Sequence, residues 1–167
     1  FTMAGGTLSL NSTTGDALDS NGSVAMTGGI LVVQGPNSAP EVAMDYNGSF
    51  NISGGLLMAS GPSSGNMIQA TSSTSSQYTV LIKLSSRLAA GTLVNIQNSS
   101  GATLVTYAPI RNAYYLVFSS SELASGKSYK VYTGGTYTGG STANGLYSAG
   151  TYSGGSQKGT FTVSGKV

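Results

Sequence analysis

Two short acidic stretches near the start of the chain carry side chains of the kind that bind cations. Residues 15–22 read Gly-Asp-Ala-Leu-Asp-Ser-Asn-Gly, and residues 41–48 read Glu-Val-Ala-Met-Asp-Tyr-Asn-Gly. Asp19 and Asp45 are 26 residues apart, and Gln69 follows after a further 24. This period is too long for a heptad and is typical of one turn of a solenoid. Stacked turns would place Asp19 over Asp45, at the roughly 4.8 Å spacing of paired strands.

Two stacked carboxylates repel each other and need compensation. At an effective dielectric near 20, the repulsion between Asp19 and Asp45 is about 3 kcal/mol. No Lys or Arg precedes Lys83, so protonation or a bound cation must offset the repulsion. We expect Ca²⁺, which accepts Asp, Asn and backbone oxygens. The candidate ligands are Asp16, Asp19, Asn21, Asp45 and Asn47. The alternative is that they are solvated turn residues, because Asp and Asn beside Gly are common in turns.

Glycine pairs at 5–6, 28–29 and 54–55 keep a similar period and align three repeats. Around them, apolar and polar residues alternate with the period of two that marks a β-strand. The aligned apolar positions form stacks: Phe1/Val24/Phe50, Met3/Met26/Ile52, Leu8/Leu31/Leu57, Leu10/Val33/Ala59 and Leu18/Met44/Ile68. The sequence therefore predicts a short parallel β-helix of about three rungs over residues 1–76, with three short strands in each rung.

One outward face of these repeats turns apolar along the chain. Its positions are polar in the first repeat, at Thr7 and Ser9, and apolar in the next two: Ile30, Val32, Leu56 and Met58. Monomeric proteins rarely expose such a patch. We expect the C-terminal half of the same chain to cover it. The four apolar residues, together with Phe1, are also candidates for self-association.

The repeat period disappears after the Ser/Thr-rich link at residues 71–77. Five later segments alternate like strands and are joined by turns: 78–84, 92–96, 103–107, 113–118 and 128–132. They predict an antiparallel meander or sandwich-like module over residues 77–167, packed against the repeats. Its Gly/Tyr-rich tail, residues 134–155, has Tyr and Leu side chains that can anchor it. The predicted fold class is all-β.

Composition excludes several classes of protein. The chain has 167 residues, 25 of them Gly, with no Cys and no His. It therefore has no thiol nucleophile, disulfide, imidazole base or usual zinc site. The first 80 residues contain four acidic and no basic residues, whereas the remainder contains seven basic residues and one acidic residue. The basic residues are scattered singly, so we predict no nucleic-acid binding.

No apolar run is long enough to span a membrane, and no signal peptide is recognisable. Because the chain starts inside a predicted rung at Phe1, we expect it to be a mature or trimmed product.

Four motifs together give the sequence a family resemblance. These are the acidic turns at 15–22 and 43–48, the Ala-Gly-Thr-Leu-Val segment at 90–94 and the Tyr-Lys-Val-Tyr-Thr-Gly-Gly run at 129–135. Over nearly its whole length, the chain resembles the C-terminal part of clostridial-type cell-surface carbohydrate-binding proteins. The resemblance implies a right-handed parallel β-helix like that of polysaccharide lyases, calcium in the Asp-bearing turns, and non-catalytic binding of cellulose or acidic plant glycans. The family's N-terminal rungs have no counterpart here.

Two functions follow as expectations. The first is an extracellular or cell-surface, calcium-stabilised carbohydrate-binding protein in which Tyr46, Tyr137, Tyr147 or Tyr152 stacks on sugar rings. Packing is the alternative role for each tyrosine. The second is a structural subunit of a self-assembling filament or surface layer, joined head to tail through strand edges and by attraction between its acidic and basic halves.

We do not expect an enzyme. A lyase of related fold would need a basic residue beside the calcium, and residues 1–76 contain none. A glycosidase could use a pair of carboxylates, but a bound cation would occupy the available ones.

Overall fold

The computed structural model describes residues 1–167 and is an all-β protein, with 51% of its residues in strands and no α-helix. The predicted all-β class is confirmed. The only helical segment is the short 3₁₀ turn η1, Gly65–Met67. No helix has the length and hydrophobicity needed to cross a bilayer.

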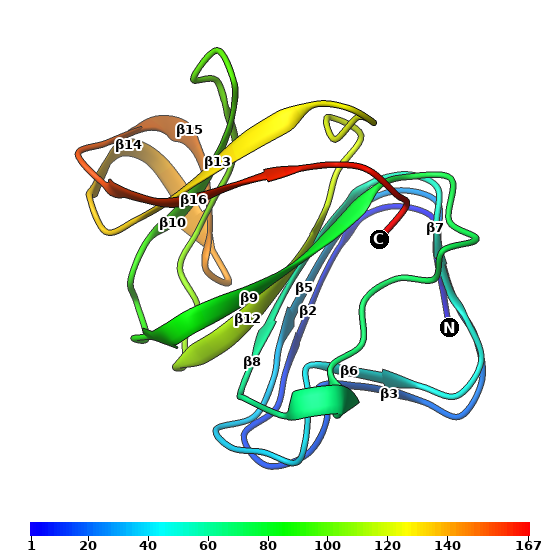
Figure 1. Ribbon diagram of the computed structural model, residues 1–167. Helices are drawn as coiled ribbons and strands as arrows, with labels where there is room; N and C mark the ends of the chain where they lie inside the picture. The colour runs from blue at the N-terminus through cyan, green and yellow to red at the C-terminus, as the bar shows by residue number, and fades with distance from the viewer.

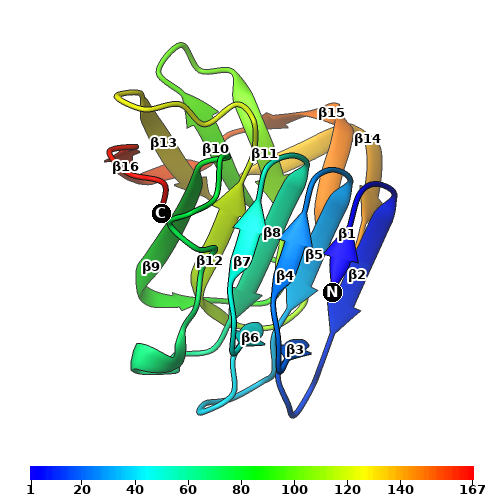
Figure 2. The ribbon, with the colours of Figure 1, turned by 90° about the vertical axis from the view of Figure 1, so that its right-hand side faces the viewer.

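The first eight strands come from the three repeats. The first repeat gives β1 Thr2–Met3, β2 Thr7–Asn11 and β3 Leu18–Ser20. The second gives β4 Val24–Met26, β5 Ile30–Gln34 and β6 Met44–Tyr46, and the third gives β7 Phe50–Ile52 and β8 Leu56–Gly61. Equivalent strands lie side by side in Figure 2. They pair in parallel as β1-β4-β7, β2-β5-β8 and β3-β6.

The predicted register of the repeats is confirmed wherever their strands pair, whereas Ile68, the third member of the Leu18/Met44/Ile68 stack, lies outside any strand. Met3 pairs with Met26 and Met26 with Ile52, while Leu8 pairs with Leu31 and Leu31 with Leu57. The alternation of apolar and polar residues fixes this register, because a slip of one residue would turn every buried side chain to the other face. The buried side chains of the stacks, among them Phe50 and Ile52, form one core cluster enclosed by the three sheets.

The remaining strands form a second layer and extend the first. They are β9 Thr79–Leu88, β10 Val94–Asn98, β11 Thr103–Tyr107, β12 Ala113–Ser119, β13 Ser128–Thr133, β14 Thr136–Ala143, β15 Leu146–Ser153 and β16 Ser156–Thr162. Six of them make an antiparallel sheet in the order β14-β15-β11-β10-β13-β16. The Gly/Tyr-rich tail supplies β14 and β15, which pair as a hairpin.

Strands β12 and β9 join the sheet of the repeats instead. β12 pairs antiparallel with β8, and β9 pairs antiparallel with β12, giving a mixed sheet in the order β2-β5-β8-β12-β9. The segments 1–76 and 77–167 therefore share a sheet. Because the sheets are partly mixed and partly antiparallel, a right-handed parallel β-helix is not confirmed for the chain.

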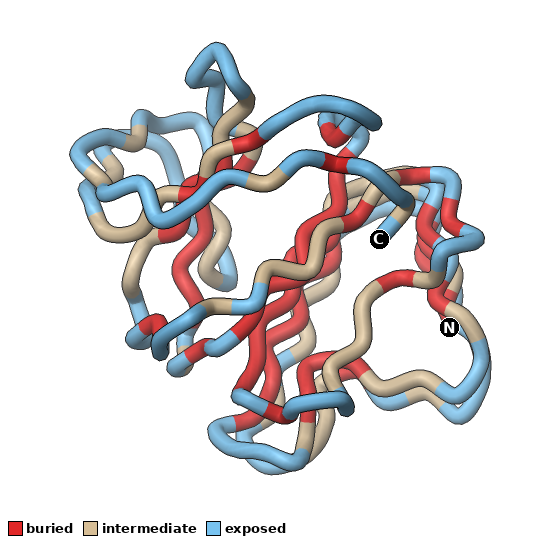
Figure 3. The backbone as a smooth tube through the Cα atoms, viewed as in Figure 1, coloured by how far each residue is buried: buried red, intermediate tan, exposed pale blue.

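A second core lies between the five-stranded and the six-stranded sheet, where Figure 3 shows buried backbone running through the middle of the molecule. Val32 and Met58, from the outward face of the repeats, are fully buried there with Ile96, Tyr107 and Phe118. Leu56 packs against the same cluster. The prediction that the C-terminal half covers this face is confirmed for these three residues. Figure 1 shows the two layers meeting at an angle.

Candidate functional site

The predicted acidic corner is formed by β3 and β6. Asp19 is the register partner of Asp45, as the repeat spacing predicted. Asp19 is exposed and Asp45 is half-buried. The strands hold both aspartates in place because Leu18 and Met44, their neighbours in sequence, are buried in the core of the repeats. The two carboxylates are thus held one strand spacing apart.

In the third repeat, a side chain occupies the place beside β6 where a third strand would pair. Gln69 Oε1 accepts a hydrogen bond of 3.1 Å from Tyr46 N, and Gln69 Nε2 donates one of 2.8 Å to Asp45 Oδ1. The prediction of three strands in every rung is therefore wrong for the third repeat. The Gln69 amide takes over hydrogen bonding that a third strand would have supplied, and it satisfies one carboxylate oxygen of Asp45.

The other predicted ligands have partners of their own. Asp16 Oδ1 accepts a hydrogen bond of 2.5 Å from Val42 N, which ties the turn of one repeat to the next. Asn47 Nδ2 donates a hydrogen bond of 3.2 Å to Asn21 Oδ1. Nowhere in the chain do three or more acidic side chains gather as a metal-binding group. The structure thus brings together Asp19 with Asp45 and Asn21 with Asn47, and Asp16 serves the backbone.

A row of uncharged polar side chains continues from the two asparagines along the same edge of the repeats. Ser49 Oγ lies 3.4 Å from Ser23 Oγ and accepts a hydrogen bond of 3.1 Å from Asn51 Nδ2. Thr74 Oγ1 donates a hydrogen bond of 2.5 Å to Asn51 Oδ1. We call Asn21, Ser23, Asn47, Ser49, Asn51 and Thr74 the polar row. All are exposed except Ser49, which is half-buried.

The four candidate tyrosines each have a packing or hydrogen-bonding role within the chain. Tyr46 donates a hydrogen bond of 2.5 Å to Ala70 O and meets Phe50 edge to face. Tyr137 accepts a hydrogen bond of 2.8 Å from Gly150 N, and its ring lies 5.0 Å from that of Tyr147. Tyr152 donates to Gly134 O over 3.0 Å. These contacts support the packing alternative, and sugar stacking stays a prediction.

The candidates for self-association lie in two different places. Phe1 and Ile30 are exposed, at 49% and 37% of their surface. Val32 and Met58, in contrast, are buried under the second layer. In this fold a second molecule cannot reach Val32 and Met58, so their assignment to self-association is corrected. Burying them within one chain already removes their apolar surface from water.

Two buried tyrosines link the repeats to the second layer. Tyr107 Oη lies 2.7 Å from Ser60 Oγ and 3.1 Å from Gln34 Oε1. Tyr115 Oη accepts a hydrogen bond of 2.8 Å from Ala43 N. Burial raises the pKa of both phenols, that of Tyr115 to about 12. These groups remain neutral near pH 7, and we assign them a structural role.

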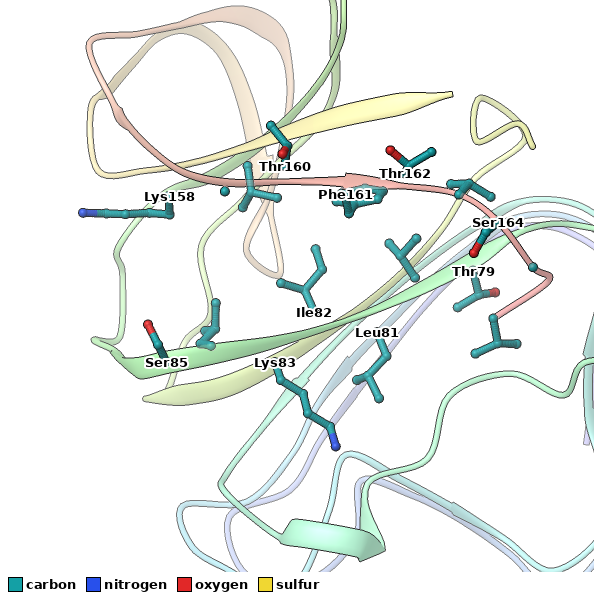
Figure 4. A pocket seen from close by; sticks show the side chains of 17 residues that line it. Thr79, Leu81, Ile82, Lys83, Ser85, Lys158, Thr160, Phe161, Thr162 and Ser164 are labelled. Carbon is teal, nitrogen blue, oxygen red and sulfur yellow. The ribbon is translucent and has the colours of Figure 1, made fainter. Parts of the chain in front are cut away.

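A groove with a volume of about 480 Å³ lies between β9 and β16. Its apolar lining includes Val80, Ile82, Val131 and Phe161. Figure 4 shows Ile82 pointing from β9 toward β16, whereas Leu81 and Lys83 point from the opposite face of β9. No local sequence signal predicts this groove, because its two walls come from strands that are about 75 residues apart in sequence and belong to different sheets.

Comparisons of the chain with protein-family models, with curated proteins and with solved structures find no match.

Proposed function

We propose that this chain is a non-catalytic, extracellular module that binds polysaccharide along the polar row. The observation that carries the proposal is the row itself, in which amide and hydroxyl groups recur at each repeat on an exposed edge. Parallel strands in register repeat roughly every 4.8 Å. A ladder of uncharged donors and acceptors can hydrogen-bond the hydroxyl groups along an extended glycan. Cellulose and acidic plant glycans are the proposed ligands, on the basis of the family resemblance described above.

The proposal includes a right-handed parallel β-helix for the repeats. Its support is the parallel, residue-for-residue pairing of three successive repeats in three sheets. In this arrangement each added repeat lengthens the polar row, so that glycan affinity scales with the number of repeats.

We further propose that a calcium ion binds at Asp19 and Asp45. The four oxygens of these two carboxylates can supply only part of the six to eight that Ca²⁺ prefers, and Asp16 Oδ1 and Asn21 Oδ1 already accept hydrogen bonds. Water or the carboxylates of an acidic glycan would complete the shell. We therefore expect calcium to strengthen the binding of acidic glycans more than that of neutral ones.

A binding experiment tests the glycan proposal. The protein is incubated with insoluble cellulose and with pectate, with calcium or with excess chelator, and bound protein and new reducing ends are measured. Asn21→Ala combined with Asn51→Ala removes two amides from the row. At roughly 1 kcal/mol per hydrogen bond, binding should weaken about thirtyfold. The matched control, Thr138→Ala with Thr142→Ala on the exposed β14–β15 hairpin, should bind normally. Release of reducing ends, or binding to neither glycan, would refute the proposal.

Calcium is tested separately by thermal unfolding. The wild-type melting temperature should rise with calcium, and Asp45→Asn should reduce that rise while relieving the repulsion between Asp19 and Asp45 in chelator. Because Asp19 is exposed and screened by water, the gain in chelator should be well below the 3 kcal/mol limit. A wild-type melting temperature that is the same with calcium and with chelator excludes a calcium site.

A structural, self-assembling subunit is the second candidate. This function is favoured by the free edges of the two large sheets. β2 and β9 are the edge strands of one sheet, and β14 and β16 are those of the other. Unpaired outer strands are templates for pairing with another chain. Sedimentation at rising protein concentration, in low and in high salt, tests this function. A monomer under all conditions would exclude it.

A further inference from the structure

The groove between β9 and β16 is bounded by two strands with free edges. β9 pairs only with β12, and β16 pairs only with β13. The C-terminal residues cover just the start of β9, where Thr79 N donates to Lys166 O over 2.9 Å. The stretch of β9 from Val80 to Ser85 thus presents a free edge beside an apolar groove.

The two faces of β9 differ in character. Val80, Ile82 and Leu84 pack on the core between the two layers and are only half-buried. Lys83 lies on the other face and is exposed, as Figure 4 shows. A strand added to β9 would therefore place alternate side chains in two environments, because successive side chains point to opposite faces of a sheet. One set would enter the apolar groove, and the other would lie beside Lys83.

The charges around the groove indicate which kind of strand can bind there. Lys83 and Lys158 are the charged residues of the lining, and no acidic residue contributes to it. Arg87, further along β9, is also exposed. Two copies of β9 paired edge to edge would bring like charges together, which is a recognised way for proteins to block such pairing. The same charges attract an acidic strand.

We propose that the β9–β16 groove is a docking site for an extended polypeptide strand in which apolar and acidic side chains alternate. The incoming strand adds to the free edge of β9, inserts its apolar side chains beside Ile82 and Phe161, and directs its acidic side chains toward Lys83. Main-chain hydrogen bonds supply affinity and the alternating side chains supply specificity. This site is separate from the polar row and independent of glycan binding.

The test uses a fluorescent synthetic peptide of alternating valine and aspartate, titrated with the full chain and followed by anisotropy. Two control peptides separate the contributions. One carries N-methyl groups at every residue and cannot donate a backbone hydrogen bond from either edge, and the other has lysine in place of aspartate. We expect the aspartate peptide to bind, both controls to fail, and hydrogen exchange to slow at the amides of residues 80–85.

Substitutions of exposed residues test the electrostatic contribution to peptide affinity without disturbing the core. Lys83→Glu with Lys158→Glu should weaken binding of the aspartate peptide about tenfold or more and should favour the lysine peptide. Lys127→Glu combined with Thr138→Glu and Thr142→Glu, all at exposed positions outside the groove lining, gives the same change in net charge and should leave affinity unchanged. Equal loss in the groove variant and in this control would overturn the proposal, as would binding of the N-methylated peptide. Absence of peptide binding in a chain that self-associates through β9 would also overturn it, in favour of a second copy as the occupant.

Discussion

Replacing Met58 with alanine tests whether the repeats and the second layer unfold as one unit. Met58 is fully buried in the cluster between the two sheets, and its backbone pairs with Phe118 of β12. Truncating a buried methionine costs about 2–5 kcal/mol, from lost transfer energy and from the cavity that remains. For a domain of this size, 1 kcal/mol corresponds to about 2–4 °C in melting temperature. A cost near 3 kcal/mol therefore predicts a fall of about 6–12 °C.

Met67→Ala is the matched control, because Met67 on η1 is 54% exposed. Its effect should stay within about 0.5 kcal/mol. Differential scanning calorimetry gives the melting temperatures, and hydrogen exchange reports the two layers separately through the amides of β4 and β10. In Met58→Ala, the most protected amides of both strands should lose the same free energy. Loss confined to β10, or two separate calorimetric transitions in the wild type, would refute the reasoning that the shared sheet couples the two parts.

Two further outcomes follow from single side chains and backbone positions. Burial raises the pKa of Tyr115 to about 12, so stability should be fully present below about pH 10, the ordinary pKa of tyrosine, and should fall as the pH rises toward 12. Tyr115→Phe should lower stability at pH 7 by about 1–3 kcal/mol, because it leaves Ala43 N unpaired. In this variant the denaturant midpoint should also fall less steeply with pH between pH 10 and 12. A slope as steep as in the wild type would contradict this account. Gly29→Ala should be much more destabilising than Gly91→Ala. Both glycines have positive φ, at 88° and 76°, but a Cβ at Gly29 would lie 2.6 Å from Gly6 O, whereas Gly91 has open space. Equal denaturant midpoints for the two variants would show that the repeats can separate to admit a methyl group.

The sequence by itself determined the parallel register of the repeats. The apolar stacks and the glycine pairs share one alignment, in which the stacked apolar side chains face the core, and this alignment places Asp19 beside Asp45. The burial of Val32 and Met58 was also predictable, because an apolar outward face needs a cover.

Only the tertiary structure decided how the cover is built. β12 joins β8 as a sheet neighbour, and no local pattern distinguishes a strand that extends a sheet from one that packs across it. The hydrogen bonds made by side chains of the acidic turns also depend on contacts between repeats. Gln69 Nε2, Val42 N and Asn47 Nδ2 each donate a hydrogen bond to a side-chain oxygen that is also a candidate calcium ligand. Hydrogen-bond partners of this kind are set by atomic positions, and residue spacing determines only which side chains come near one another.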